Sequence, residues 1–224
     1  MLRFVACAGL MAALAGPAAA GPVSFVDFRE PAFAGANAQS SFEGVIPDGP
    51  GFEVFAFERT GSGEVARALF QDEQDGLGIR GGTANDEIDQ QEGLRIEFAQ
   101  TIGLTTLFFA DLFFETGAGA GGEGASIFLD GVFFGTVTAA TIDRDFIDPA
   151  TGFSLNAANG EGAFELGGII PLNTLTVFTH TANRGNEFAF LGFIDPPLEI
   201  VGPAALPLFG LGLGAAAMAR RRRH

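Results

Sequence analysis

SIFLDGVFFGTV, residues 126–137, is the stretch that decides the fold class of this chain. Two apolar runs, 126–129 and 132–137, flank the dipeptide Asp130-Gly131. Asp-Gly between two such runs favours a two-residue type I′ turn, whose central residues both need positive φ. The segment therefore predicts an antiparallel β-hairpin.

Strand patterns continue on both sides of this hairpin. Residues 94–98 (LRIEF) alternate between apolar and polar, which predicts one buried face. Residues 105–114 (TTLFFADLFF) are apolar on both faces, as in a central strand. A short helix near residues 63–71 is the one weak helical pattern. Further strands are predicted at 24–28, 52–59, 163–170, 174–180 and 188–194. Nine or ten strands in one unit predict an all-β fold, a single β-sandwich of jelly-roll type.

The two ends of the chain differ from the body between them. Arg3, an apolar core at 4–14, and small residues Ala18 and Ala20 predict a signal peptide that signal peptidase removes after Ala20. Cys7 lies in this leader, so the processed chain contains no cysteine and no disulfide. The predicted organisation is a signal peptide at 1–20, a β-sandwich domain at 21–195, a linker at 196–202 and a C-terminal segment at 203–224.

The body is strongly acidic. All 27 acidic residues lie between the two ends, where seven arginines oppose them and no lysine occurs, so the processed body carries about −20. Such a charge disfavours binding to nucleic acid or to an anionic membrane. It leaves open simple solubility and the binding of divalent cations. Tyrosine and tryptophan are absent, which weighs against a strong carbohydrate site.

One segment concentrates the acidic residues. Residues 72–92 (DEQDGLGIRGGTANDEIDQQE) hold seven carboxylates among glycines that allow tight turns. Calcium takes six to eight oxygen ligands on adaptable loops, so this segment is a candidate calcium site, although it lacks the EF-hand pattern. The alternative is a solvated acidic loop. The candidate ligands are Asp72, Asp75, Asp86, Glu87, Asp89 and Glu92.

Catalytic patterns are weak. His180 and the terminal His224 are the only histidines, and Ser62 lies in Gly61-Ser62-Gly63 without the strand–turn–helix setting of a nucleophile elbow. We therefore expect no enzymatic activity and no catalytic residue. The alternative is a secreted carbohydrate-binding protein or carbohydrate-active enzyme on the same scaffold, because among 27 acidic residues some pair will meet the spacing of a glycosidase.

The C-terminal segment has three parts. Pro203, Ala204 and Ala205 precede an uncharged apolar run that ends at Ala219. Counted from Ala204, the run has 16 residues, about 24 Å as a helix, against a hydrocarbon core of roughly 30 Å. A buried core helix is the alternative to a transmembrane helix. The chain closes with the cluster Arg220, Arg221, Arg222 and Arg223, which favours a cytoplasmic end and a body outside the cytoplasm.

This tail resembles the PEP-CTERM class of bacterial sorting signals, in its variant with a V-P-L-P-A-A motif. The matching stretch is Ile200–Ala205, in which Val201 replaces the first proline and Gly202 replaces the leucine. The run Gly76–Ile79, followed by Glu87–Asp89 and the strand at 94–98, is also similar to a segment common in the bodies of this family.

The resemblance implies that an exosortase-type membrane transpeptidase processes the tail. It further implies that the protein is tethered to the membrane first and then joins the cell surface or an extracellular polysaccharide matrix. A plain anchored protein without tail processing is the other reading.

Overall fold

The computed structural model describes residues 23–81, 87–89, 91–113, 122–147, 153–179, 187–196 and 198. All of them belong to one compact unit, Gly21–Leu198. The predicted signal peptide, the Pro203-Ala204-Ala205 motif and the tail arginines lie outside the described residues. Within the described part, no helix is both long enough and apolar enough to cross a membrane.

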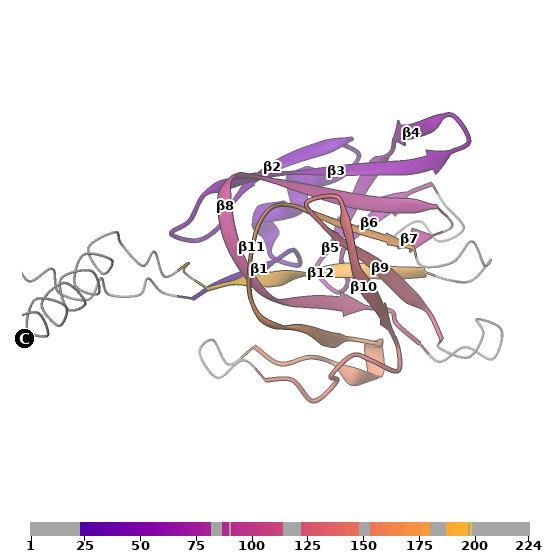
Figure 1. The fold of residues 1–224 in the computed structure, drawn as a ribbon. Coiled ribbons are helices and arrows are strands. Elements are labelled where there is room, and N and C mark those ends of the chain that lie inside the picture. The colour runs from indigo at the N-terminus through magenta and orange to yellow at the C-terminus, as the bar shows by residue number, and fades with distance from the viewer. Residues whose placement is uncertain are drawn as a thin grey trace, which may run out of the picture. The chain divides into compact units, whose positions relative to one another are not determined.

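The described residues form an all-β structure, as the sequence predicts (Figure 1). Twelve strands join in one sheet, accompanied by two short 3-10 helices, η1 (Pro31–Ala36) and η2 (Ala157–Asn159). The strands are β1 (Ser24–Asp27), β2 (Ser41–Val45), β3 (Gly51–Thr60), β4 (Gly63–Ala66), β5 (Ala68–Asp72), β6 (Gly76–Arg80), β7 (Ile88–Asp89), β8 (Glu92–Ala110), β9 (Gly124–Leu129), β10 (Val132–Thr138), β11 (Gly162–Thr179) and β12 (Glu187–Asp195).

Two long strands, β8 and β11, connect two groups of strands in this sheet (Figure 1). One group pairs with the first part of β8 and the last part of β11, and it contains β3 and β9. The other group pairs with the last part of β8 and contains β12. The first part of β8 pairs with β3, and its last part pairs with β12. β11 follows β8 along both parts, with register shifts between Glu165 and Ile170 and between Leu172 and Thr174. Gly167, at φ 78°, lies inside the first shift and allows the strand to bend there. Within the described residues, β8 therefore joins the two strands predicted at 94–98 and 105–114. In the same way, β11 joins the two strands predicted at 163–170 and 174–180.

Phenylalanine fills the core between these two groups of strands. The ring of Phe193 on β12 lies 6.1 Å from that of Phe52 on β3 and 5.5 Å from that of Phe98 on β8. These ring contacts connect β12 with β3 and with β8. Phe28 joins the same group of rings, 6.2 Å from Phe193. Each such buried side chain contributes roughly 1.5–3 kcal/mol of hydrophobic stabilisation.

The β9–β10 hairpin has the predicted turn. Asp130 and Gly131 both have positive φ, 48° and 77°, which is the type I′ geometry. The Asp130 carboxylate also accepts hydrogen bonds from the backbone N–H groups of Asn173 and Thr174, each at 2.8 Å. The turn residue that closes the hairpin therefore also fixes it to β11.

The helix predicted near residues 63–71 is wrong. Residues 63–66 form β4, which continues β3 as a hairpin, and 68–72 form β5 against β6. Residues 76–80, inside the acidic segment 72–92, form β6. Leu69 on β5 and Leu77 and Ile79 on β6 are almost completely buried, and strand pairing with this burial outweighs local helix preference.

Candidate functional site

The acidic residues at the start of the predicted calcium segment hold a turn and a loop. The Asp72 carboxylate accepts hydrogen bonds from the backbone N–H groups of Gln74 and Asp75, at 2.8 and 2.7 Å, and so closes the β5–β6 turn. Asp75 in turn accepts a 2.6 Å hydrogen bond from the Asn159 side chain, which ties this turn to η2. Asp86 lies outside the described residues.

The other end of the segment contains a buried pair of carboxyl groups. Asp89 and Glu92 are only 4% and 3% exposed, and the Asp89 backbone N–H donates to Glu92 Oε2 at 3.2 Å. Burial raises the pKa of Glu92 to about 8, and the neighbouring Asp89 carboxylate acts in the same direction. A hydrogen bond between the two side chains also raises the pKa of Glu92.

The predicted calcium ligands therefore have different roles in the structure: Asp72 and Asp75 hold a turn, whereas Asp89 and Glu92 form a buried pair. Glu87, next to this pair, accepts a backbone hydrogen bond from Ile79 at its carbonyl oxygen. Across the described ranges, no three histidine, cysteine, aspartate or glutamate side chains are grouped so that they could hold a metal ion. Calcium binding by the segment stays a prediction, with Asp86 as the member that the structure does not describe.

A second charged cluster surrounds Arg29, just after β1. Its guanidinium binds both carboxylate oxygens of Asp27, at 2.9 and 2.8 Å, and lies 3.5 Å from Glu161. Glu161 is 3% exposed and accepts the Asn156 backbone N–H at 2.7 Å. Burial raises the pKa of Glu161, while these hydrogen bonds and Arg29 act in the opposite direction.

This cluster lines a small polar pocket of about 220 Å³ whose other residues include Glu73, Gln74 and Asn159. The pocket joins β1, the β5–β6 turn and the loop before β11, which are far apart in the sequence. Sequence reasoning missed it, although Asn156 and the Asn159-Gly160 pair are a weak signal for a capped turn.

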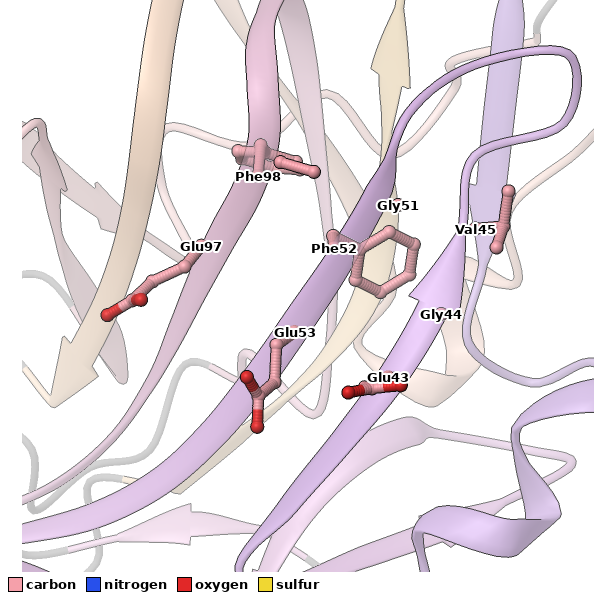
Figure 2. Close-up of a pocket in the computed structure, with 9 residues that line it drawn as sticks. Glu43, Gly44, Val45, Gly51, Phe52, Glu53, Glu97 and Phe98 are labelled. Carbon is pink, nitrogen blue, oxygen red and sulfur yellow. The ribbon is translucent and has the colours of Figure 1, made fainter.

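An open groove lies on β2, β3 and β8 (Figure 2). Its volume is about 570 Å³. Three of its lining residues form one row across the strands, because Glu43 is paired with Glu53 and Glu53 with Glu97. Carboxylates directly opposite one another repel, so this row raises the free energy of the folded state unless cations screen it.

Aromatic side chains form the apolar part of the groove (Figure 2). The ring of Phe52 lies against Gly44 on the neighbouring strand, where an added Cβ would be only 2.4 Å from a ring carbon. Gly44 is therefore the residue that leaves room for this ring. At one end of the row, Glu97 accepts a 3.0 Å hydrogen bond from Arg95. The groove offers hydrogen-bond acceptors and negative charge beside a ring, and sequence reasoning missed it entirely.

The candidates for catalysis gain no support from their described neighbours. Ser62 lies in the exposed β3–β4 turn, where its hydroxyl is 3.0 Å from that of Thr60. His180 and His224 lie outside the described residues. No family model, curated protein or solved structure matches this chain.

Proposed function

We propose that this chain is an exported, non-enzymatic protein of the cell surface or of an extracellular polysaccharide matrix. In this proposal signal peptidase removes residues 1–20, the C-terminal segment tethers the body outside the cytoplasm, and an exosortase-type transpeptidase then processes the tail near Pro203. The body is a jelly-roll-type β-sandwich, which the ring contacts between β12 and strands β3 and β8 support.

The observation that carries the proposal is the pairing of the first and last strands. β1 runs antiparallel to β12, and Ser24 is the partner of Asp195. The body therefore begins and ends at the same place in the fold. Asp195 is fixed there, since its carboxylate accepts the Gly103 backbone N–H at 3.1 Å. This arrangement suits a body that is attached through a tail, because both termini of the body lie at one end of the fold and the rest of its surface stays accessible.

The acidic groove lies close to that end. The Ser24 hydroxyl donates a 2.6 Å hydrogen bond to the carbonyl of Pro47, in the turn between the two groove strands β2 and β3. The row of Glu43, Glu53 and Glu97 is the acidic part of this groove. We infer that divalent cations, calcium above all, bridge these carboxylates to anionic groups of the polysaccharide.

The intact mass of the protein from its native host, in cell-envelope and medium fractions, tests the proposal. We expect a species that lacks residues 1–20 and ends near Pro203, and any added mass at the new end would identify the attached molecule. A mass that still ends at His224, found only in membranes, would instead mean a plain anchored protein.

A further inference from the structure

The polar pocket beside Arg29 has no role in the proposed function, yet it has the size and the walls of a binding site. Its volume is about 220 Å³. At roughly 30 Å³ for each molecule, this space holds about seven waters, which is roughly the volume of one hexose. The lining side chains are all polar or charged: Arg29, Glu73, Gln74, Asn156, Asn159 and Glu161.

The inner wall of this pocket is held in place by contacts within the protein. Glu161 is 3% exposed and accepts the Asn156 backbone N–H at 2.7 Å. The Arg29 guanidinium forms two hydrogen bonds to Asp27 and lies over the ring of Phe153, 4.8 Å from its centroid. Polar groups that are already fixed lose little conformational entropy when a ligand binds, so the wall is preorganised.

Charge selects the class of ligand. Arg29 is the cation between the carboxylates of Asp27 and Glu161, at 2.8 and 3.5 Å. A metal ion is disfavoured here, because Arg29 already supplies the counter-charge and would repel it. An anionic ligand is disfavoured as well, because Glu73 and Glu161 both line the pocket. The pocket therefore favours a neutral, polar ligand.

The hydrogen-bonding groups of the wall match a sugar. Arg29 supplies only donors, and the ionised carboxylates of Glu73 and Glu161 supply only acceptors. The side-chain amides of Gln74 and Asn159 supply both. Each hydroxyl group of a sugar donates and accepts at the same time, so such a mixed wall can satisfy it.

We propose that this pocket binds one neutral hexose unit of a polysaccharide, without a metal ion. The inference takes from the proposed function only that the protein meets such a polymer outside the cytoplasm. Tyrosine and tryptophan are absent from the chain, so hydrogen bonds provide most of the binding. At the affinity per non-hydrogen atom of drug-sized ligands, a methyl hexoside binds with a dissociation constant of about 1 mM.

Saturation-transfer difference NMR of the full chain, in a detergent without sugar groups, tests the proposal. The probes are the methyl glycosides of glucose, galactose and mannose, with EDTA present, and methyl glucuronoside is the anionic comparator. Because the method observes the ligand, it suits weak binding to a large protein–detergent particle.

The informative variant is Glu73→Ala with Gln74→Ala, which removes two exposed side chains of the pocket. The backbone hydrogen bonds that close this turn on Asp72 do not involve these side chains, so the turn is kept. The loss of their hydrogen bonds should raise the dissociation constant about tenfold. The matched control is Glu97→Ala with Gln100→Ala, which removes the same two exposed side-chain types at the groove strand β8. Gln74→Ala alone is the second variant, for use if thermal melting shows that the double variant is unfolded.

The proposal predicts that at least one of the three neutral glycosides binds in EDTA, that the pocket variant weakens this binding and that the groove variant keeps it. Methyl glucuronoside should bind more weakly than that glycoside. No saturation transfer to any of the three at about 20 mM, a concentration well above the expected dissociation constant, would mean that the pocket holds only water and would overturn the proposal. Binding that the groove variant weakens, that needs calcium, or that the pocket variant keeps at full strength would place the sugar elsewhere and overturn it as well. The mass of the processed chain is independent of all these results, so the two proposals fail separately.

Discussion

Replacing Glu92 with glutamine should remove a defined part of the pH dependence of folding. Glu92 lies beside Asp89, almost without exposure to solvent, and its pKa rises from 4.5 to about 8. Between these two values the folded protein keeps a proton that the unfolded chain has lost. The folded state therefore binds more protons, and its free energy of unfolding falls as the pH rises from about 4.5 to about 8. Above about pH 8 the stabilisation that comes from the proton on Glu92 is lost completely, and below about pH 4.5 it is fully present.

The magnitude follows from the two pKa values. Each pH unit between them corresponds to 1.36 kcal/mol, so the whole window amounts to about 3–5 kcal/mol. Glutamine keeps the shape of the side chain and stays neutral at every pH. We expect Glu92→Gln to be more stable than the wild type at pH 8.5, relative to their difference at pH 5, by about this amount. Removing the neighbouring charge with Asp89→Asn should lower the pKa of Glu92 in the folded protein and so narrow the window from its upper end.

Urea denaturation at pH values from 5 to 9 measures this effect, with the wild type and each variant compared at the same pH. Glu97→Gln is the matched control, because Glu97 lies on the same strand with a side chain that is 52% exposed. Because Glu97→Gln also relieves the repulsion in the groove row, its curve should show at most a small upward offset and not the large change between pH 5 and 8.5 that is expected for Glu92→Gln. Parallel curves for Glu92→Gln and the wild type would refute the reasoning, since Glu92 would then ionise equally in the folded and unfolded chains.

Three further measurements follow from the structure. Arg29→Met removes the counter-charge of buried Glu161 and should cost about 2–4 kcal/mol in urea denaturation at pH 7; an unchanged midpoint would mean that the cluster is not a stabilising contact. Gly192→Ala should lower the free energy of unfolding by about 3 kcal/mol or more, because Gly192 has φ 152° and a Cβ there would lie 1.9 Å from the carbonyl oxygen of Val26. Gly168→Ala is its control: an added Cβ there has no atom within 4 Å, so the free energy of unfolding should change by less than about 1 kcal/mol. Titration of the chelated protein with calcium should raise its melting temperature through ligand linkage, and no rise at millimolar calcium would remove calcium from the proposed function.

Local chemistry predicted the parts of the fold that depend on neighbouring residues. The dipeptide Asp130-Gly131 predicted a type I′ turn because few other pairs tolerate positive φ at both positions. Alternation predicted the strand at 94–98, which is the buried first part of β8. The same kind of local reasoning failed at 63–71, where pairing with β3 and β6 decides the structure.

The candidate sites could not be predicted from local sequence patterns, because their residues are brought together by the fold. The sequence places seven carboxylates together in 72–92, but their neighbours in space come from elsewhere, such as Asn159 for Asp75. The groove carboxylates Glu43, Glu53 and Glu97 are up to 54 positions apart in the sequence and become neighbours only through strand register. Proximity in the sequence therefore does not tell which carboxylates are neighbours in space.

By itself, then, the sequence determined the all-β class, the hairpin at 126–137, the acidity of the body and the distinct character of both ends. These properties depend on composition and on residues a few positions apart, whose preferences act before the chain is folded. Only the tertiary structure decided which carboxyl groups are buried together, which glutamates share a row and which polar side chains meet around Arg29. Those outcomes depend on the register and bending of β8 and β11, and a shift of one residue in register would turn every side chain to the opposite face.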